Sequence, residues 1–118
     1  MLRFLRPYAL AAALVLAMAP AAATESFVDG LDDVPLMAGL ESLPDRSLVF
    51  DKPNGRIVES YAAGAVRRAE VVRFYEGTLP QLGWSGRGPT WRREGEVLRL
   101  GFEGRDGALV VRFSLSPR

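Results

Sequence analysis

The sequence predicts an α+β fold, a two-layer sandwich in which one helix covers a mostly antiparallel sheet. Two observations predict this class. Apolar residues recur at helical spacing in one long stretch, residues 66–84, and they alternate with polar residues in short segments on both sides of it. Tight turn sequences join most of these short segments, which favours antiparallel hairpins. The expected order is strand, strand, helix, strand, strand, strand.

Residues 1–23 have the features of a cleaved signal peptide. Arg3 and Arg6 provide a positive start, and residues 9–19 form an apolar segment too short for a permanent anchor, which disfavours an uncleaved membrane anchor. The alanines ending at Ala23 fit the small-residue rule for cleavage. We therefore expect a periplasmic or extracellular protein that has no stable membrane span after cleavage.

Residues 24–46 are expected to form an acidic, apolar-rich arm in front of a single α+β domain, residues 47–118. The arm contains too many apolar residues for a free tail, while two prolines and a glycine would interrupt a long helix. We expect it to be largely extended, with one short turn that starts at residues 33–35.

Two strands are expected between the arm and the helix. Leu48 and Phe50 alternate with polar or smaller neighbours, as in a strand. Residues 51–56, which contain the sequence Pro-Asn-Gly at 53–55, are expected to form a turn, and residues 56–62 return as the second strand.

The helix has a clear end and an uncapped start. Pro80 disfavours helical geometry at Leu79, so we expect a kink or break there. Gly83 suits a left-handed residue past the last turn, which would fold Trp84 back onto Leu79. No usual capping residue lies near the start, where Gly64 is the nearest substitute.

One face of this helix is expected to pack against the sheet. Its apolar stripe consists of Val72, Tyr75, Leu79 and Leu82, widened by Val71 and Phe74. We interpret Phe74, Tyr75 and Trp84 as core residues rather than as aromatics that stack on a ligand, because large aromatic residues contribute most to small cores.

Three strands are expected after the helix, at residues 90–93, 96–103 and 108–115. Glu94-Gly95 and Asp106-Gly107 are hairpin signals between them. The first of these turns would place Trp91 opposite Leu98 on the core side. Residues 85–89 are interpreted as a loop or a short edge strand.

Composition excludes several classes of function. Without Arg3 and Arg6, 13 of the 15 basic residues remain against 14 acidic residues, so a net charge of −1 gives no reason to expect nucleic-acid binding. The sequence contains no histidine and no cysteine, which removes Ser-His and Cys-His nucleophiles, disulfides and ordinary zinc or haem ligands. We expect no enzyme and no cofactor; a carboxylate-only hydrolase is the remaining catalytic alternative.

Three motifs cover much of the mature chain: DGLDDVPLM at residues 29–37, FDxPxGR at 50–56 and FYxxxLPxLGW at 74–84. Together they resemble motifs of small secreted bacterial proteins of unknown function. The resemblance implies secretion and a shared fold, and it carries no catalytic activity. It marks Phe74, Tyr75, Leu79, Pro80, Gly83 and Trp84 as structural residues.

Two functions are compatible with these features. The first is a non-catalytic module that binds another envelope protein through its arm or a sheet edge. The alternative is a binder of an anionic small ligand, polysaccharide or lipid headgroup. Such a ligand would contact arginines that strand alternation turns away from the helix, namely Arg92, Arg99 and Arg112.

The acidic residues of the arm suggest a link between these surfaces. Asp29, Asp32 and Asp33 lack the spacing of a calcium loop, so no metal site is expected. They could instead neutralise the outward arginines, which would make the arm an intramolecular lid. Arg99 and Arg112 lie directly opposite if the last turn is at 105–106, and diagonally if it is at 106–107. The alternative is a solvated outer face with the arm held elsewhere.

Overall fold

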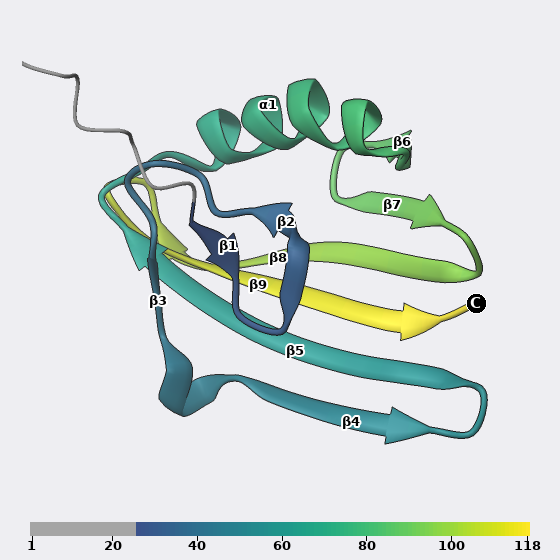
Figure 1. Cartoon of the computed structure of the whole chain (residues 1–118). Coiled ribbons are helices and arrows are strands. Elements are labelled where there is room, and N and C mark those ends of the chain that lie inside the picture. The colour runs from purple at the N-terminus through teal and green to yellow at the C-terminus, as the bar shows by residue number, and fades with distance from the viewer. Residues whose placement is uncertain (1–25) are drawn as a thin grey trace, which may run out of the picture.

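The structure is a computed structural model that describes residues 26–118, so the expected signal peptide lies outside the described residues (Figure 1). In chain order the elements are β1 (Phe27–Val28), β2 (Leu31–Pro35), β3 (Glu41–Ser42), the 3₁₀ helix η1 (Pro44–Arg46), β4 (Leu48–Lys52), β5 (Gly55–Gly64), α1 (Arg68–Thr78), the 3₁₀ helix η2 (Leu79–Leu82), β6 (Ser85–Arg87), β7 (Thr90–Arg93), β8 (Glu96–Arg105) and β9 (Ala108–Pro117). Among these residues, no helix is long and apolar enough to cross a membrane.

Seven strands form one antiparallel sheet in the order β3-β5-β9-β8-β7-β6, and β4 pairs with β5 on the same side as β3. Strands β1 and β2 form a separate hairpin. The α+β class, with one α-helix and a mostly antiparallel sheet, is confirmed. The predicted order of elements is wrong, because three short strands precede residue 47 and a fourth strand, β6, follows the helix.

Helix α1 and the β1–β2 hairpin pack on the same face of the sheet (Figure 1). The ring of Tyr75 packs edge-on against Phe113 of β9, with 5.5 Å between the ring centroids. The tip of the hairpin lies against Val58 of β5. Val58 pairs with Leu115, two residues from Phe113, so both contacts are made on one face. We call the opposite side of the sheet the outer face.

The segment described as an arm therefore contributes to the core. Five of its residues are buried with the helix and sheet: Val28, Leu31, Val34, Met37 and Leu40. The prediction of a turn starting at residues 33–35 is wrong, because these residues belong to β2. The hairpin instead turns at Asp29-Gly30, where Gly30 has a φ of 77° that favours glycine.

The end of the helix follows the sequence signals. The α-helix stops at Thr78, and η2 begins at Leu79, one residue before Pro80. Gly83 is left-handed, with a φ of 89°. The N–H of Trp84 then donates to the Leu79 carbonyl at 3.1 Å, and the indole is buried.

The packed face of the helix is narrower than predicted. Val71, Tyr75 and Leu79 are buried at four-residue steps. Val72 and Phe74 are half-buried, and Leu82 is 39% exposed, so Leu82 is not part of the stripe. Because the 3₁₀ turn after Thr78 changes the residue spacing, a stripe extrapolated at 3.6 residues per turn no longer faces the sheet there.

The start of the helix is capped from outside the local sequence. Arg67 occupies the N-cap position, and its side chain makes no capping hydrogen bond. The expectation that Gly64 would take the place of a capping residue is therefore wrong. The Oδ1 atom of Asp106, in the β8–β9 turn, accepts a hydrogen bond from the Arg68 N–H at 2.9 Å. The neighbouring Gly107 N–H donates to the Val66 carbonyl at 2.9 Å, which fixes the turn against the helix.

Candidate functional site

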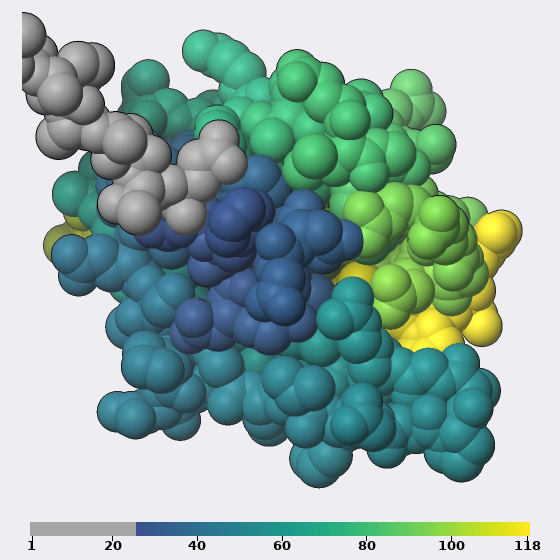
Figure 2. Space-filling view, viewed as in Figure 1, coloured from purple at the N-terminus to yellow at the C-terminus, as the bar shows by residue number. Residues whose placement is uncertain are grey.

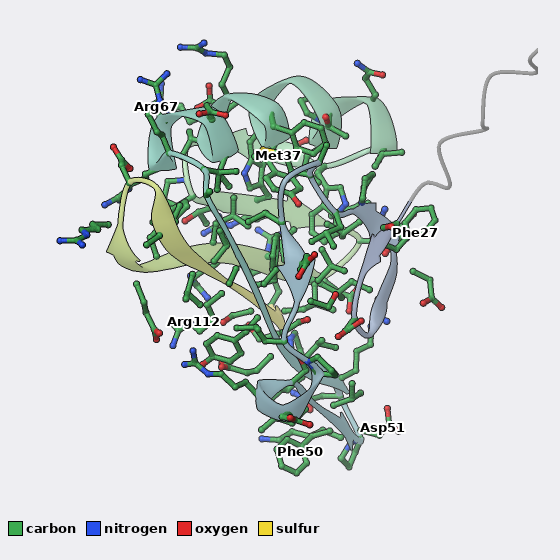
Figure 3. The ribbon with its side chains drawn as sticks, turned by 90° about the vertical axis from the view of Figure 1, so that its left-hand side faces the viewer. Phe27, Met37, Phe50, Asp51, Arg67 and Arg112 are labelled. Atoms are coloured by element: carbon green, nitrogen blue, oxygen red, sulfur yellow. The ribbon has the colours of Figure 1, made fainter. Side chains whose placement is uncertain are left out.

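Strand β4 is an exposed apolar edge of the sheet. It pairs only with β5, and all five of its residues are exposed. Leu48, Val49 and Phe50 have exposed fractions of 43%, 55% and 57%, which are large values for apolar side chains. Figure 2 shows the hairpin formed by β4 and β5 along the lower edge of the molecule. Figure 3 shows Phe50 and Asp51 at the end of the molecule that is remote from α1. The unpaired backbone groups of such an edge can accept another strand.

The register explains why β4 is uncovered. Strand β5 pairs with β9 only from Val58 onward, whereas it pairs with β4 down to Gly55. The β4–β5 hairpin therefore extends past the end of the β9 ladder. The other edge element on this side, β3, pairs with Ala62 and Ala63 and leaves β4 free.

The two faces of β4 have different surroundings. Leu48 and Phe50 pair with Glu59 and Ile57 and lie on the outer face. Val49 pairs with Val58 and lies on the inner face, beside the tip of the β1–β2 hairpin. A Cβ atom added at Gly30 would lie 3.0 Å from Cγ2 of Val49, so the hairpin packs closely there.

The three outward arginines lie where strand alternation predicts. Arg92, Arg99 and Arg112 are exposed on β7, β8 and β9. Arg112 pairs with Gly101 and Arg99 with Ser114, so these two arginines are diagonal neighbours, as the turn at 106–107 requires. None of the three takes part in an ion pair within residues 26–118.

The absence of a side chain at Gly101 leaves room for the Arg112 side chain. A Cβ atom added at Gly101 would lie 3.3 Å from Nε of Arg112. The guanidinium therefore extends across β8 rather than straight into solvent. Glu59 and Glu103 also belong to this face, so the arginine row lies among carboxylates and is only moderately basic.

The structure does not bring the acidic and basic candidates together. Asp29, Asp32 and Asp33 belong to the β1–β2 hairpin, and Figure 3 shows Phe27 of that hairpin and Arg112 on opposite sides of the sheet. The lid interpretation is therefore wrong. The apolar residues of the hairpin are buried against the inner face, and this burial determines on which face the neighbouring aspartates lie.

Asp33 pairs instead with Arg93, a residue that sequence reasoning missed. The Arg93 guanidinium bonds the Asp33 carboxylate, lies 4.4 Å from the centre of the Trp84 ring, and donates to the Leu82 carbonyl at 3.1 Å. It thereby connects the hairpin to the end of the helix. Alternation along β7 was the available signal, because Arg93 shares the inner side with Trp91.

A hollow of about 680 Å³ lies next to this contact. Arg92, Arg93 and Arg118 form part of its wall, together with Ser85 and Glu94. Asp33 pairs with Arg93, and Glu94 lies in the same wall, so carboxylates offset part of the positive charge around the hollow. Within the described part of the chain, no cluster of acidic side chains could hold a metal ion.

Burial of Tyr75 changes the pKa of its side chain. Burial raises the pKa of its phenol, and the hydrogen bond from the Met37 N–H opposes this only in part. The phenol also donates to the Pro35 carbonyl at 2.7 Å. Both partners are backbone groups within residues 24–46, the segment expected to be an arm, so Tyr75 has a structural role in joining this segment to α1.

No protein-family model, curated protein or solved structure matches this chain. Its function is therefore inferred from the geometry of its own residues.

Proposed function

We propose that this protein is a non-catalytic binding module that holds an extended segment of another polypeptide chain along the free edge of β4. The observation that carries the proposal is that all five residues of β4 are exposed at the sheet edge, including three consecutive large apolar residues, Leu48, Val49 and Phe50. Because a signal peptide is expected, we place this partner in the periplasm or outside the cell.

Strand addition uses two kinds of contact. The backbone groups of the edge provide hydrogen bonds without regard to sequence, and the side chains select the partner. In this protein Leu48 and Phe50 would contact the added strand on the outer face, and Val49 would contact it on the inner face. Natural edge strands are usually protected by charge, proline or a covering element, so an uncovered apolar edge favours an interaction site.

Site-specific photo-crosslinking tests this function. A photo-reactive residue is introduced at position 50 and, as a matched control, at position 82, because Leu82 is also a large exposed apolar residue but lies outside the edge. We expect crosslinks from position 50 to one defined segment of a polypeptide chain, located by mass spectrometry. Crosslinking from position 50 no stronger than from position 82 would contradict the proposal.

The outer arginines support a second candidate, binding of an anionic ligand. Arg92, Arg99 and Arg112 form a diagonal row of exposed side chains without ion-pair partners within residues 26–118. We expect Arg99→Glu combined with Arg112→Glu to abolish retention on dextran sulfate while leaving the crosslink from position 50 intact. Retention that the double variant does not change would exclude these arginines as the site.

A further inference from the structure

We infer that the strand added to β4 is β4 of a second copy of this chain, paired antiparallel across a twofold axis at Val49. The inference rests on the proposed function of β4 as a pairing edge and names the occupant of that edge. It depends on the order of residues along the strand, Leu48, Val49, Phe50, Asp51 and Lys52.

Twofold symmetry limits the registers that two β4 strands can adopt. When the axis is perpendicular to the sheet, one residue lies opposite its own copy, and its neighbours pair in reciprocal fashion. An axis at Phe50 would place Val49 opposite Asp51 and Leu48 opposite Lys52. An axis at Asp51 would place two carboxylates opposite each other, which is unfavourable.

An axis at Val49 is the register that pairs all three apolar residues of β4 with apolar residues. Each Leu48 lies opposite Phe50 of the second copy, and the two Val49 side chains face each other. The axis keeps the faces of both sheets aligned, so Leu48 and Phe50 of both copies meet on the outer face. The paired Val49 side chains lie on the inner face, next to the two hairpin tips.

The charges near the strand ends are compatible with this register. Lys52 of one copy would approach Arg46 of the other if the strand continued, but η1 interrupts it. The Arg46 guanidinium lies 4.1 Å from the centre of the Tyr61 ring and 3.2 Å from the Glu103 carboxylate of its own sheet. Arg46 is therefore held over its own outer face. A near-neutral mature chain also offers little long-range repulsion between copies.

The pairing involves one short strand from each copy. Stable interfaces bury far more surface than a strand of five residues can offer, so we expect a dimer that forms and dissociates with concentration. Sedimentation equilibrium of the purified protein over a concentration series measures this directly. We expect a monomer–dimer equilibrium for the wild type.

Charge substitutions at the axis test the register. Val49→Lys and Val49→Asp each place two like charges opposite each other, so we expect each variant alone to lose the dimer. Mixed in equal amounts, the two variants should form a heterodimer, because the introduced charges are then opposite in sign. Phe50→Lys should also lose the dimer, whereas Leu82→Lys, the control away from the edge, should dimerise as the wild type does. Circular dichroism verifies that each variant is folded.

The outcomes separate this inference from the proposed function. A wild type that stays monomeric, a dimer that persists in Val49→Lys, or a mixture that fails to pair would overturn the inference. If the protein is monomeric but position 50 crosslinks to a different polypeptide, the edge function stands and the second copy is excluded. If neither the dimer nor the crosslink forms, both proposals fail.

Discussion

At the scale of single residues, Tyr75 shows how a local pattern determines a long-range contact. Its place in the helical stripe predicted burial, and the ring packs against Phe113 as expected for a core residue. Nothing in the local pattern predicted that its hydroxyl would bond Pro35 and Met37, because those partners lie about forty residues earlier in the chain. These two bonds hold the end of β2 and the residues after it against α1.

Tyr75→Phe is expected to destabilise the protein while keeping the ring packing. The variant leaves the Met37 N–H and the Pro35 carbonyl without their partner, and an unsatisfied buried polar group costs about 1–3 kcal/mol. Urea unfolding of the wild type and the variant measures the difference. Equal stability would mean that water replaces the phenol and that the two bonds do not hold the segment.

The raised pKa of Tyr75 gives a second expectation, for alkaline pH. Below a pH of about 10, the ordinary pKa of tyrosine, the phenol is protonated in both the folded and the unfolded chain. Above it the unfolded chain releases the proton while the folded chain retains it, so the free energy of unfolding decreases as pH rises. Tyr75→Phe lacks this contribution. Between pH 8 and 11 the free energy of unfolding should therefore decrease more steeply with pH for the wild type than for Tyr75→Phe. Chemical unfolding at several pH values measures both slopes, and identical slopes would refute the assignment.

Trp84 anchors the end of the helix in the core. Only 2% of its surface is exposed, so Trp84→Ala should cost roughly 3–5 kcal/mol, a large part of the stability of a small domain. Thermal unfolding gives the comparison, and Trp84→Phe serves as a milder control that keeps an aromatic ring. A fully stable Trp84→Ala variant would contradict the core assignment.

At the scale of elements, the two ends of α1 show what the sequence can and cannot predict. The end was predictable because Pro80 and Gly83 act on their own neighbours. The start was not predictable because its cap, Asp106, lies 38 residues further along the chain. Strands β1, β3 and β6 have only two or three residues each, too few for a visible alternation, and so they were missed or left open.

Removing the distant cap should weaken the helix. Asp106→Ala is expected to cost about 0.5–2 kcal/mol, the usual range for loss of an N-cap side chain. Asp106→Asn should retain most of the stability because its amide oxygen can accept the same bond. Asp32→Ala, at an exposed aspartate that makes no such bond within residues 26–118, provides the control in chemical denaturation. Equal stability of the Asp106→Ala and Asp32→Ala variants would show that the cap contributes nothing.

At the scale of the whole molecule, the candidate site could be predicted only in part. Leu48 and Phe50 were recognised as strand residues, and the outward direction of Arg92, Arg99 and Arg112 followed from alternation. The sequence could not show that β4 lies at an edge, because edge position depends on which strands pair across the sheet. The same limit explains why the acidic hairpin was predicted on the wrong face. Its negative charge favoured contact with the outward arginines, whereas its apolar residues are buried in the core and determine where it packs.

The central claim is that the free edge of β4 pairs with another strand. Amide hydrogen exchange of the purified protein at low and high concentration tests it most directly, with β6, the short edge on the opposite side of the sheet, as an internal reference. We expect exchange within Leu48–Lys52 to slow as the concentration rises, while exchange within Ser85–Arg87 stays unchanged. Exchange in β4 that remains fast at every concentration would contradict pairing between copies. If exchange in β4 also stays fast after the polypeptide identified by crosslinking from position 50 is added, the edge function itself would be contradicted.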